Sequence, residues 1–288
     1  MKVEDVKNTA VIGFGVMGAG IVQVLAQAGY QVGVRDVSNE LLQRGLNIIK
    51  SFLSKSVEKG KMKKEDADAA VSRIKVNTST AEIVKNADFI VEAVFEDMDL
   101  KKKLFKELDE ICPKHTILAT NTSMLSVSEL AKATKRPDKV VGMHFFNPVP
   151  LMKLVEVIKG DATSEETVNV TKELSVKLGK VPVVAKDSPG FIVNRVAALL
   201  FPNEGVRALA EGVATKEDID TAVKLGMNFP MGPLELLDLI GIDTAVDVME
   251  SMYKKMDDPK WKPHPLLVEM KNKGLTGRKA GKGFYTYK

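Results

Sequence analysis

Three glycines near the start of the chain are the first residues whose spacing suggests chemistry. Gly13, Gly15 and Gly18 form the pattern G-x-G-x-x-G between a β-rich run and a helical run. In such a turn the first glycine permits a tight change of direction, the second lets backbone approach a pyrophosphate, and the third lets the helix pack closely. The pattern predicts a dinucleotide cofactor whose phosphates meet the N–H groups at the start of the helix. Glycines also mark ordinary tight turns, which is the alternative.

Asp36 follows the next β-rich run, 31–35. A carboxylate at about this distance from the glycines accepts hydrogen bonds from the adenosine ribose hydroxyls. It also repels a 2′-phosphate, so the sequence favours NAD over NADP. Arg35 stands beside it and could bind a 2′-phosphate, which keeps NADP as the less favoured alternative.

His144 and Glu156 are the residues best suited to move a proton. His144 ends a β-rich run, and an imidazole both gives and takes a proton near neutral pH. Glu156 is flanked by valines in another β-rich run, and a buried acid needs a partner such as the His144 N–H. Two plainer interpretations stay open: a structural histidine, and a glutamate on the solvent face of an edge strand.

Polar residues at two other places are weaker candidates. Asn121 and Ser123 follow the apolar run 116–120, where short polar side chains are often only turn formers. Asn194 lies inside the apolar run 191–201, where an amide is costly unless it finds partners.

Composition restricts the classes of partner. The formal net charge of +4 is small and dispersed, which argues against nucleic acid and suits an anionic small ligand. Cys112 is the only cysteine, and the three histidines are far apart, so we expect no disulfide and no metal site. No apolar run approaches the roughly 20 residues that span a bilayer, and no signal-peptide pattern is present, so we expect a cytoplasmic protein without a membrane partner.

The elements that must position these residues alternate between β-rich and helical runs up to residue 185. This alternation predicts an α/β fold with a doubly wound, Rossmann-type parallel sheet. The carboxyl ends of its strands share one edge, so Gly13, Asp36, Asn121 and His144 are expected in one crevice. The predicted strands are Thr9–Ile12, Gln31–Arg35, Ile74–Asn77, Asp88–Val94, Thr116–Thr120, Val140–His144, Leu154–Lys159 and Val181–Ala185.

A Pro-Gly pair at 189–190 marks a domain boundary. We expect an NAD-binding domain over 1–187 and an all-helical domain over 188–288 that binds substrate and forms a homodimer. The apolar run 191–201 predicts a buried helix that Pro202 kinks or breaks. Further helices are predicted over 216–225, with Thr215 as N-cap, and over 233–252 and 264–271.

Several motifs occur in order along the whole chain: Gly13–Gly18, Val91–Ala93, Asn121–Ser123, Gly142–Pro148, Pro189–Arg195, Met231–Pro233 and Gly277–Tyr285. With them the chain resembles the L-3-hydroxyacyl-CoA dehydrogenases, and most of all the bacterial 3-hydroxybutyryl-CoA branch of that family. The resemblance implies reversible hydride transfer between a nicotinamide and C3 of a short acyl-CoA such as acetoacetyl-CoA, in fatty acid or butyrate metabolism.

The same resemblance implies roles for individual residues. His144 would be the acid/base, Glu156 its orienting carboxylate, and Ser123 and Asn194 the donors that hold the substrate oxygen. Glu96 and Lys101 would meet the nicotinamide half of the cofactor. The implied cofactor-binding set is Gly13, Gly15, Val16, Met17, Gly18, Asp36, Glu96, Lys101, Asn121, Ser123, Asn147 and Lys279.

Lysines are concentrated between residues 50 and 64. Lys55 and Lys59 are four apart and would share a helix face. Such a face is usually only solvated, but an acyl-CoA carries phosphates, so we expect both lysines to bind the substrate.

Two alternatives come from other classes. A β-hydroxyacid dehydrogenase of the 6-phosphogluconate type also joins a glycine-rich domain to a helical one, but it uses a lysine as acid/base. An inactive dinucleotide-binding structural protein would have kept the fold without the chemistry.

Overall fold

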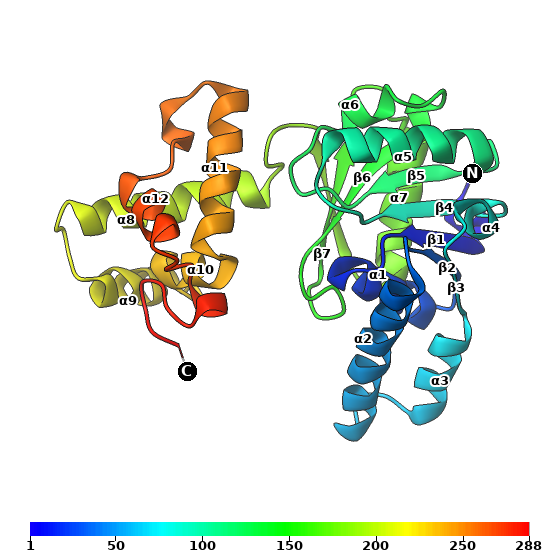
Figure 1. Cartoon of the computed structure of the whole chain (residues 1–288), viewed down its shortest axis with the longest axis horizontal. Coiled ribbons are helices and arrows are strands. Elements are labelled where there is room, and N and C mark those ends of the chain that lie inside the picture. The colour runs from blue at the N-terminus through cyan, green and yellow to red at the C-terminus, as the bar shows by residue number, and fades with distance from the viewer. Residues whose placement is uncertain (288) are drawn as a thin grey trace. The chain divides into compact units, whose positions relative to one another are not determined.

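The computed structural model describes residues 1–287 (Figure 1). The chain divides into two compact units between Ser188 and Pro189, one residue from the boundary expected from the sequence. Each unit has its own hydrophobic core.

The first unit is built on one sheet of eight strands in the order β3-β2-β1-β4-β5-β6-β7-β8. Strands β1 to β6 are parallel, as a doubly wound fold requires. All eight predicted strands are present: β1 Asn8–Ile12, β2 Gln31–Arg35, β3 Ile74–Asn77, β4 Phe89–Glu92, β5 Ile117–Thr120, β6 Val140–Phe145, β7 Leu154–Lys159 and β8 Val181–Lys186.

The predicted doubly wound, Rossmann-type sheet is confirmed, and it departs from parallel pairing where β7 runs antiparallel to β6. A parallel pair needs a crossover of about a dozen or more residues, and only residues 146–153 separate these strands. Lys180 stabilises this short turn, because its buried ammonium donates to the Val149 carbonyl at 2.5 Å and the Met152 carbonyl at 2.9 Å. Burial lowers the pKa of Lys180.

Five helices of the first unit begin at a side chain that caps their first turn. The N-caps of α2, α4, α5, α6 and α7 are serine or aspartate side chains that accept a backbone N–H from the first turn. Helices α2 and α3 extend from the sheet as a pair (Figure 1). The helices are α1 Val16–Gln27, α2 Asn39–Glu58, α3 Lys64–Ser72, α4 Thr80–Val84, α5 Met98–Ile111, α6 Val127–Ala131 and α7 Glu165–Lys177, with short 3-10 turns η1 Val3–Asp5 and η2 Pro137–Lys139.

The second unit is helical. Thr215 caps α9 as predicted, and His264 caps α12 rather than lying inside it. The helix predicted over 233–252 is two helices, because Gly241 adopts a positive φ of 98° between them. The elements are η3 Asn194–Leu200, α8 Phe201–Ala210, α9 Lys216–Met227, α10 Pro233–Ile240, α11 Ile242–Met256, η4 Pro259–Trp261, α12 Pro265–Asn272 and η5 Arg278–Ala280.

The apolar run 191–201 is not the buried helix that we expected. Its central part, η3, is a π-helix in which Leu199 is buried while Val196 is 63% exposed, because only one side packs inside the unit. Pro202 does not interrupt the helix, because η3 continues directly into α8. It lies in the first turn of α8, where a missing N–H is tolerated, just after the π-helix ends.

Among residues 1–287, no helix combines the length and apolarity needed to cross a membrane.

Asp88 joins the start of β4 to two other segments. One carboxylate oxygen accepts the backbone N–H groups of Lys7 and Asn8, each at 2.9 Å, and the other lies 2.9 Å from His115 Nε2. Burial acts to raise the pKa of Asp88, but the hydrogen bonds from Asn8, Lys7 and His115 outweigh it, so the pKa is lowered.

We expect Asp88→Asn to lower the free energy of unfolding by about 1 kcal/mol at about pH 7, after allowance for solvent screening. A lowered pKa in the folded state stabilises the protein above the unfolded-state pKa, and this stabilisation is lost as pH falls through the folded-state value. The free energies of unfolding of the two proteins, measured in urea, should therefore become equal at about pH 3. Asp68→Asn, which removes an exposed ion pair with Lys64, is the control. A gap that does not change with pH would contradict the assignment.

Candidate active site

The glycine turn is closed at two positions and open at the third. Gly13 has φ +97°, and a Cβ there would lie 2.6 Å from the Ala93 carbonyl oxygen. A Cβ on Gly18 would lie 1.9 Å from the Gly13 carbonyl oxygen. Gly15 differs, since a Cβ there would meet nothing within 4 Å. The backbone at Gly15 therefore borders open space, which is what a diphosphate group needs to approach it.

The start of α1 is suited to an anion. Its N-cap is Gly15, no side chain caps it, and its first turn contains no acidic residue. The first N–H groups of a helix have no partner inside the helix, and the helix dipole gives them a partial positive charge. The side chain of Val16 is exposed in this first turn, and Met17 is partly buried. The donors at this end fit the phosphates of a dinucleotide.

Asp36 connects β2 to the glycine turn. One of its carboxylate oxygens accepts the backbone N–H of Phe14 and the other accepts that of Val37, each at 2.6 Å. The side chain is partly exposed, so lone pairs remain for a ribose hydroxyl. Arg35 Nε donates to the Thr78 carbonyl at 3.4 Å.

His144 and Glu156 form a buried pair. They are directly opposite in the antiparallel pairing of β6 with β7, and His144 Nδ1 lies 2.7 Å from Glu156 Oε2. Their side chains are only 8% and 1% exposed. The interpretation of Glu156 as a solvent-facing edge residue is therefore wrong. With Nδ1 held by the carboxylate, proton exchange with a ligand falls to Nε2.

Asn121 links the ends of three strands. Its backbone N–H donates to the Glu92 carbonyl at 2.8 Å, and its side-chain oxygen accepts the Phe145 N–H at 2.9 Å. The residue just past β5 is thereby fixed against the end of β6, next to His144. Its role in the structure is more specific than that of a turn former.

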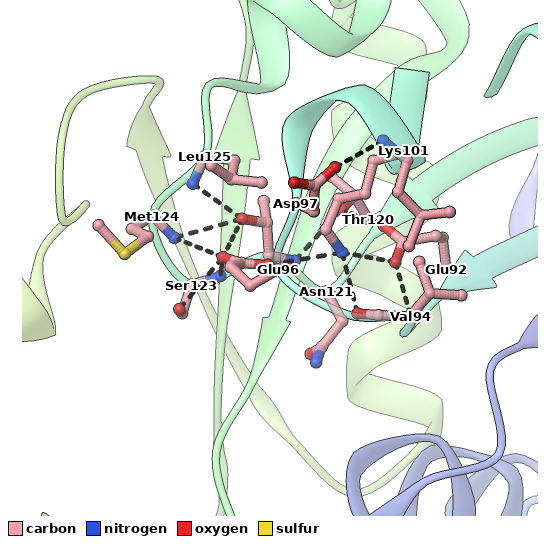
Figure 2. Close-up of polar contacts among 12 residues, drawn as sticks. Glu92, Val94, Glu96, Asp97, Lys101, Thr120, Asn121, Ser123, Met124 and Leu125 are labelled. Carbon is pink, nitrogen blue, oxygen red and sulfur yellow. Dashed lines mark hydrogen bonds and ion pairs between the residues drawn. The ribbon is translucent and has the colours of Figure 1, made fainter. Parts of the chain in front are cut away.

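Ser123 lies in a turn that is held by Glu96 (Figure 2). The Glu96 Oε1 atom accepts the Ser123 N–H at 2.8 Å and the Thr122 hydroxyl at 2.5 Å. Lys101 is 3.5 Å from the other oxygen of Glu96 and is almost completely buried, where it contacts Glu92 at 2.5 Å. Burial raises the pKa of Glu92, although Lys101 and Thr120 act in the opposite direction.

Other predicted residues lie elsewhere. Asn147 is exposed in the turn between β6 and β7. Lys55 is in the last turn of α2 and Lys59 is its C-cap, both exposed. Asn194 and Lys279 belong to the second unit, where Asn194 begins η3 and Lys279 Nζ lies 2.6 Å from Asp243.

Glu92 was given no role in the site, and Thr122 was predicted only as part of the segment Asn121–Ser123, with no role of its own. A charged residue in the apolar run 89–92 was the signal for Glu92, since an acid is almost never fully buried without a partner. Thr122 had no such signal, because a threonine after a strand is typical of any turn.

Residues 8–188 match the family model described as the NAD binding domain of 3-hydroxyacyl-CoA dehydrogenase, and residues 190–287 match the C-terminal domain of the same enzyme. The chain belongs to the 3-hydroxyacyl-CoA dehydrogenase family. The resemblance inferred from the motifs is thereby confirmed over the 6-phosphogluconate-type alternative.

Individual relatives are similar over nearly their whole length. The chain is 49% identical over 278 residues to the 3-hydroxybutyryl-CoA dehydrogenase of Clostridioides difficile, covering 96% of this chain and 98% of that protein. It is 47% identical over 283 residues to a probable 3-hydroxybutyryl-CoA dehydrogenase of Bacillus subtilis, covering 98% of each. The crystal structure of (S)-3-hydroxybutyryl-CoA dehydrogenase from Ralstonia eutropha has a TM-score of 0.95 and 43% identity, covering 99% of this chain and 100% of that one.

Alanine substitutions at Gly15 and Gly18 should differ in their effect on stability. Gly15→Ala should leave the free energy of unfolding within about 0.5 kcal/mol of the parent, because its methyl group meets no protein atom. It should weaken NADH binding by about tenfold or more, because the methyl group fills the phosphate space. Gly18→Ala should lower both stability and binding, because its methyl group overlaps the Gly13 carbonyl.

Urea unfolding and titration with NADH, followed by its fluorescence, measure the two effects separately. Gly226→Ala is the matched control, since a Cβ there also meets nothing and the residue lies in α9 of the second unit. A Gly15→Ala protein that binds NADH as tightly as the parent would contradict the phosphate assignment.

Proposed function

We propose that this chain is an NAD-dependent, short-chain L-3-hydroxyacyl-CoA dehydrogenase that interconverts 3-hydroxybutyryl-CoA and acetoacetyl-CoA. The observation that carries the proposal is the buried His144–Glu156 pair at the end of β6, in the same unit as the glycine turn. The family to which the chain belongs and the printed names of its relatives support it.

The nicotinamide, when bound, exchanges a hydride with C3 of the substrate. His144 Nε2 gives a proton to the oxygen on C3 during reduction and removes it during oxidation. Glu156 keeps the other proton on Nδ1, which selects the tautomer, and its negative charge stabilises the imidazolium. The burial of both side chains strengthens this electrostatic effect, because water screens it less.

Ser123 and Asn194 donate hydrogen bonds to the same substrate oxygen in this proposal. Negative charge grows on that oxygen as the hydride arrives, so donors aimed at it stabilise the transition state more than the ground state. Asn121 supports the arrangement by fixing the end of β5 against β6.

The cofactor preference follows from charge. Asp36 presents a carboxylate beside the glycine turn, and a carboxylate repels a 2′-phosphate. Arg35 Nε donates to the Thr78 carbonyl at 3.4 Å, and its other guanidinium donors keep NADP as the less favoured alternative. Glu96, Lys101, Asn147 and Lys279 are proposed for the nicotinamide half.

The proposed contacts with the CoA phosphates are Lys55 and Lys59, both exposed cations at the end of α2. The Lys59 N–H donates to the Lys55 carbonyl at 3.2 Å, so the two residues stay one helical turn apart. We also propose a homodimer through the helical unit. Large apolar side chains on its surface support this, among them Val196, Leu225 and Met227.

Acetoacetyl-CoA mixed with NADH should lead to loss of the reduced-nicotinamide absorbance. The rate with NADH should exceed that with NADPH by about tenfold or more, because Asp36 disfavours the 2′-phosphate. A faster reaction with NADPH would overturn the preference alone. No reaction with either cofactor would overturn the proposed function and favour the inactive dinucleotide-binding alternative.

Glu156→Gln should lower kcat by about a hundredfold or more while NADH binding stays near that of the parent. Loss of the anion disfavours the imidazolium, so the pH profile for acetoacetyl-CoA reduction should move to lower pH. His144→Gln should lose most of the rate and show no such shift. Glu165→Gln, which removes an exposed ion pair with Lys159, is the control. If Glu156→Gln lowers kcat and leaves the pH profile unchanged, the carboxylate does not act through the imidazole.

A further inference from the structure

Glu92 is a completely buried acid at the end of β4, so it cannot touch a ligand. Both of its oxygens are used inside the protein (Figure 2). The Oε1 atom accepts Lys101 Nζ at 2.5 Å and the Val94 N–H at 2.7 Å, and Oε2 accepts the Thr120 hydroxyl at 2.7 Å. Glu92 therefore acts only through the residues around it.

Lys101 connects Glu92 to Glu96, because its ammonium forms an ion pair with each carboxylate. An ammonium has three N–H donors. Lys101 donates to Glu92 at 2.5 Å and to the Val94 carbonyl at 3.3 Å, and it forms an ion pair with Glu96 Oε2 at 3.5 Å. Lys101 is 1% exposed, so its charge is balanced within this cluster rather than by water. Lys101 contacts Glu96 at Oε2, whereas the Ser123 N–H binds the other oxygen, Oε1.

Glu96 in turn holds the turn after β5. Its Oε1 atom accepts the Thr122 hydroxyl and the Ser123 N–H, with longer contacts of 3.3 Å from the Ser123 hydroxyl and the Met124 N–H. The long hydroxyl contact is weak, so the Ser123 hydroxyl can turn to another acceptor while the backbone stays in place.

We infer that Glu92 is a positioning residue, which fixes Glu96 through Lys101 and thereby fixes the turn that carries the Ser123 hydroxyl. What Ser123 then does rests on the proposed function. Without the charge of Glu92, Lys101 keeps Glu96 as its one charged partner in this cluster and draws that carboxylate away from the turn. The Ser123 and Met124 N–H groups then lose the Glu96 oxygen as an acceptor, although the Met124 N–H also donates to Thr122 Oγ1 at 3.3 Å. The position of the Ser123 hydroxyl is then less well fixed.

Amide hydrogen exchange tests this link without substrate or cofactor. In Glu92→Gln the Ser123 and Met124 N–H groups should exchange about tenfold faster or more than in the parent, because they open locally more often. The glutamine has the same shape and can still bond to Lys101 and Thr120, so the sheet is retained. Glu129→Gln is the matched control. It removes an exposed carboxylate that pairs with Lys132 and that, within residues 1–287, has no hydrogen bond to the Ser123 or Met124 N–H groups. Unchanged exchange at both amides overturns the inference.

A double-mutant cycle tests the consequence for the reaction. Glu92→Gln should lower kcat for acetoacetyl-CoA reduction at saturating NADH by about tenfold, and NADH affinity should fall as well, because Glu96 is proposed to contact the nicotinamide half. Combined with Ser123→Ala, it should lower kcat no further than Ser123→Ala alone, because both changes remove one effect. Independent losses that multiply overturn the inference. If the parent protein reduces no acetoacetyl-CoA, the proposed function fails, and the exchange measurement still decides the positioning role.

If Glu92→Gln does not fold, the pair Glu92→Gln with Lys101→Met replaces it. This variant leaves no unpaired charge in the interior, yet Glu96 loses its support. Exchange at Ser123 and Met124 should again be about tenfold faster. Protection equal to that of the parent would show that the buried pair serves folding alone.

Discussion

Glu156 lies in the middle of β7 and is 1% exposed, so its charge has to be balanced inside the protein. His144 supplies that balance only because β7 runs antiparallel to β6 and places the two residues opposite each other. The short turn between these strands, with the buried ammonium of Lys180 bonded to its carbonyls, is therefore part of what makes the imidazole useful. The proposed proton transfer therefore depends on the direction of one strand.

Residue patterns were sufficient for the eight strands and for the helix that Thr215 caps, because β-branched runs and side-chain caps act locally. The direction of β7 was missed, although the eight residues before it are too few for a crossover. Burial was harder to predict. Val196 is as apolar as Leu199, and only the packing inside the unit decides that one is exposed and the other buried. Gly241 was overlooked as a helix end, although a glycine at this place often has a positive φ.

Within the site, the glycine turn, Asp36 and His144 could be found from type and spacing alone. The pairing of His144 with Glu156 could be suggested but not decided, since an acid between valines is compatible with either face of an edge strand. Glu92 gave a local signal as an acid in an apolar run, but its pairing with Lys101 could not be predicted from local patterns, because it depends on both side chains being buried against each other. The burial of a charged pair depends on tertiary structure, so it cannot be predicted from the preferences of single residues.

Asp36 uses both of its carboxylate oxygens to hold backbone N–H groups, one in the glycine turn and one after β2. The residue that we propose to select the cofactor thus also holds the backbone of the glycine turn in place. Replacing Asp36 with a neutral side chain, in order to admit a 2′-phosphate, would also remove the acceptor of the Phe14 N–H. The glycine turn, which is proposed to bind the cofactor phosphates, would then be less well held. In this dehydrogenase a change of coenzyme therefore calls for a replacement acceptor at the Phe14 N–H, introduced together with the new specificity.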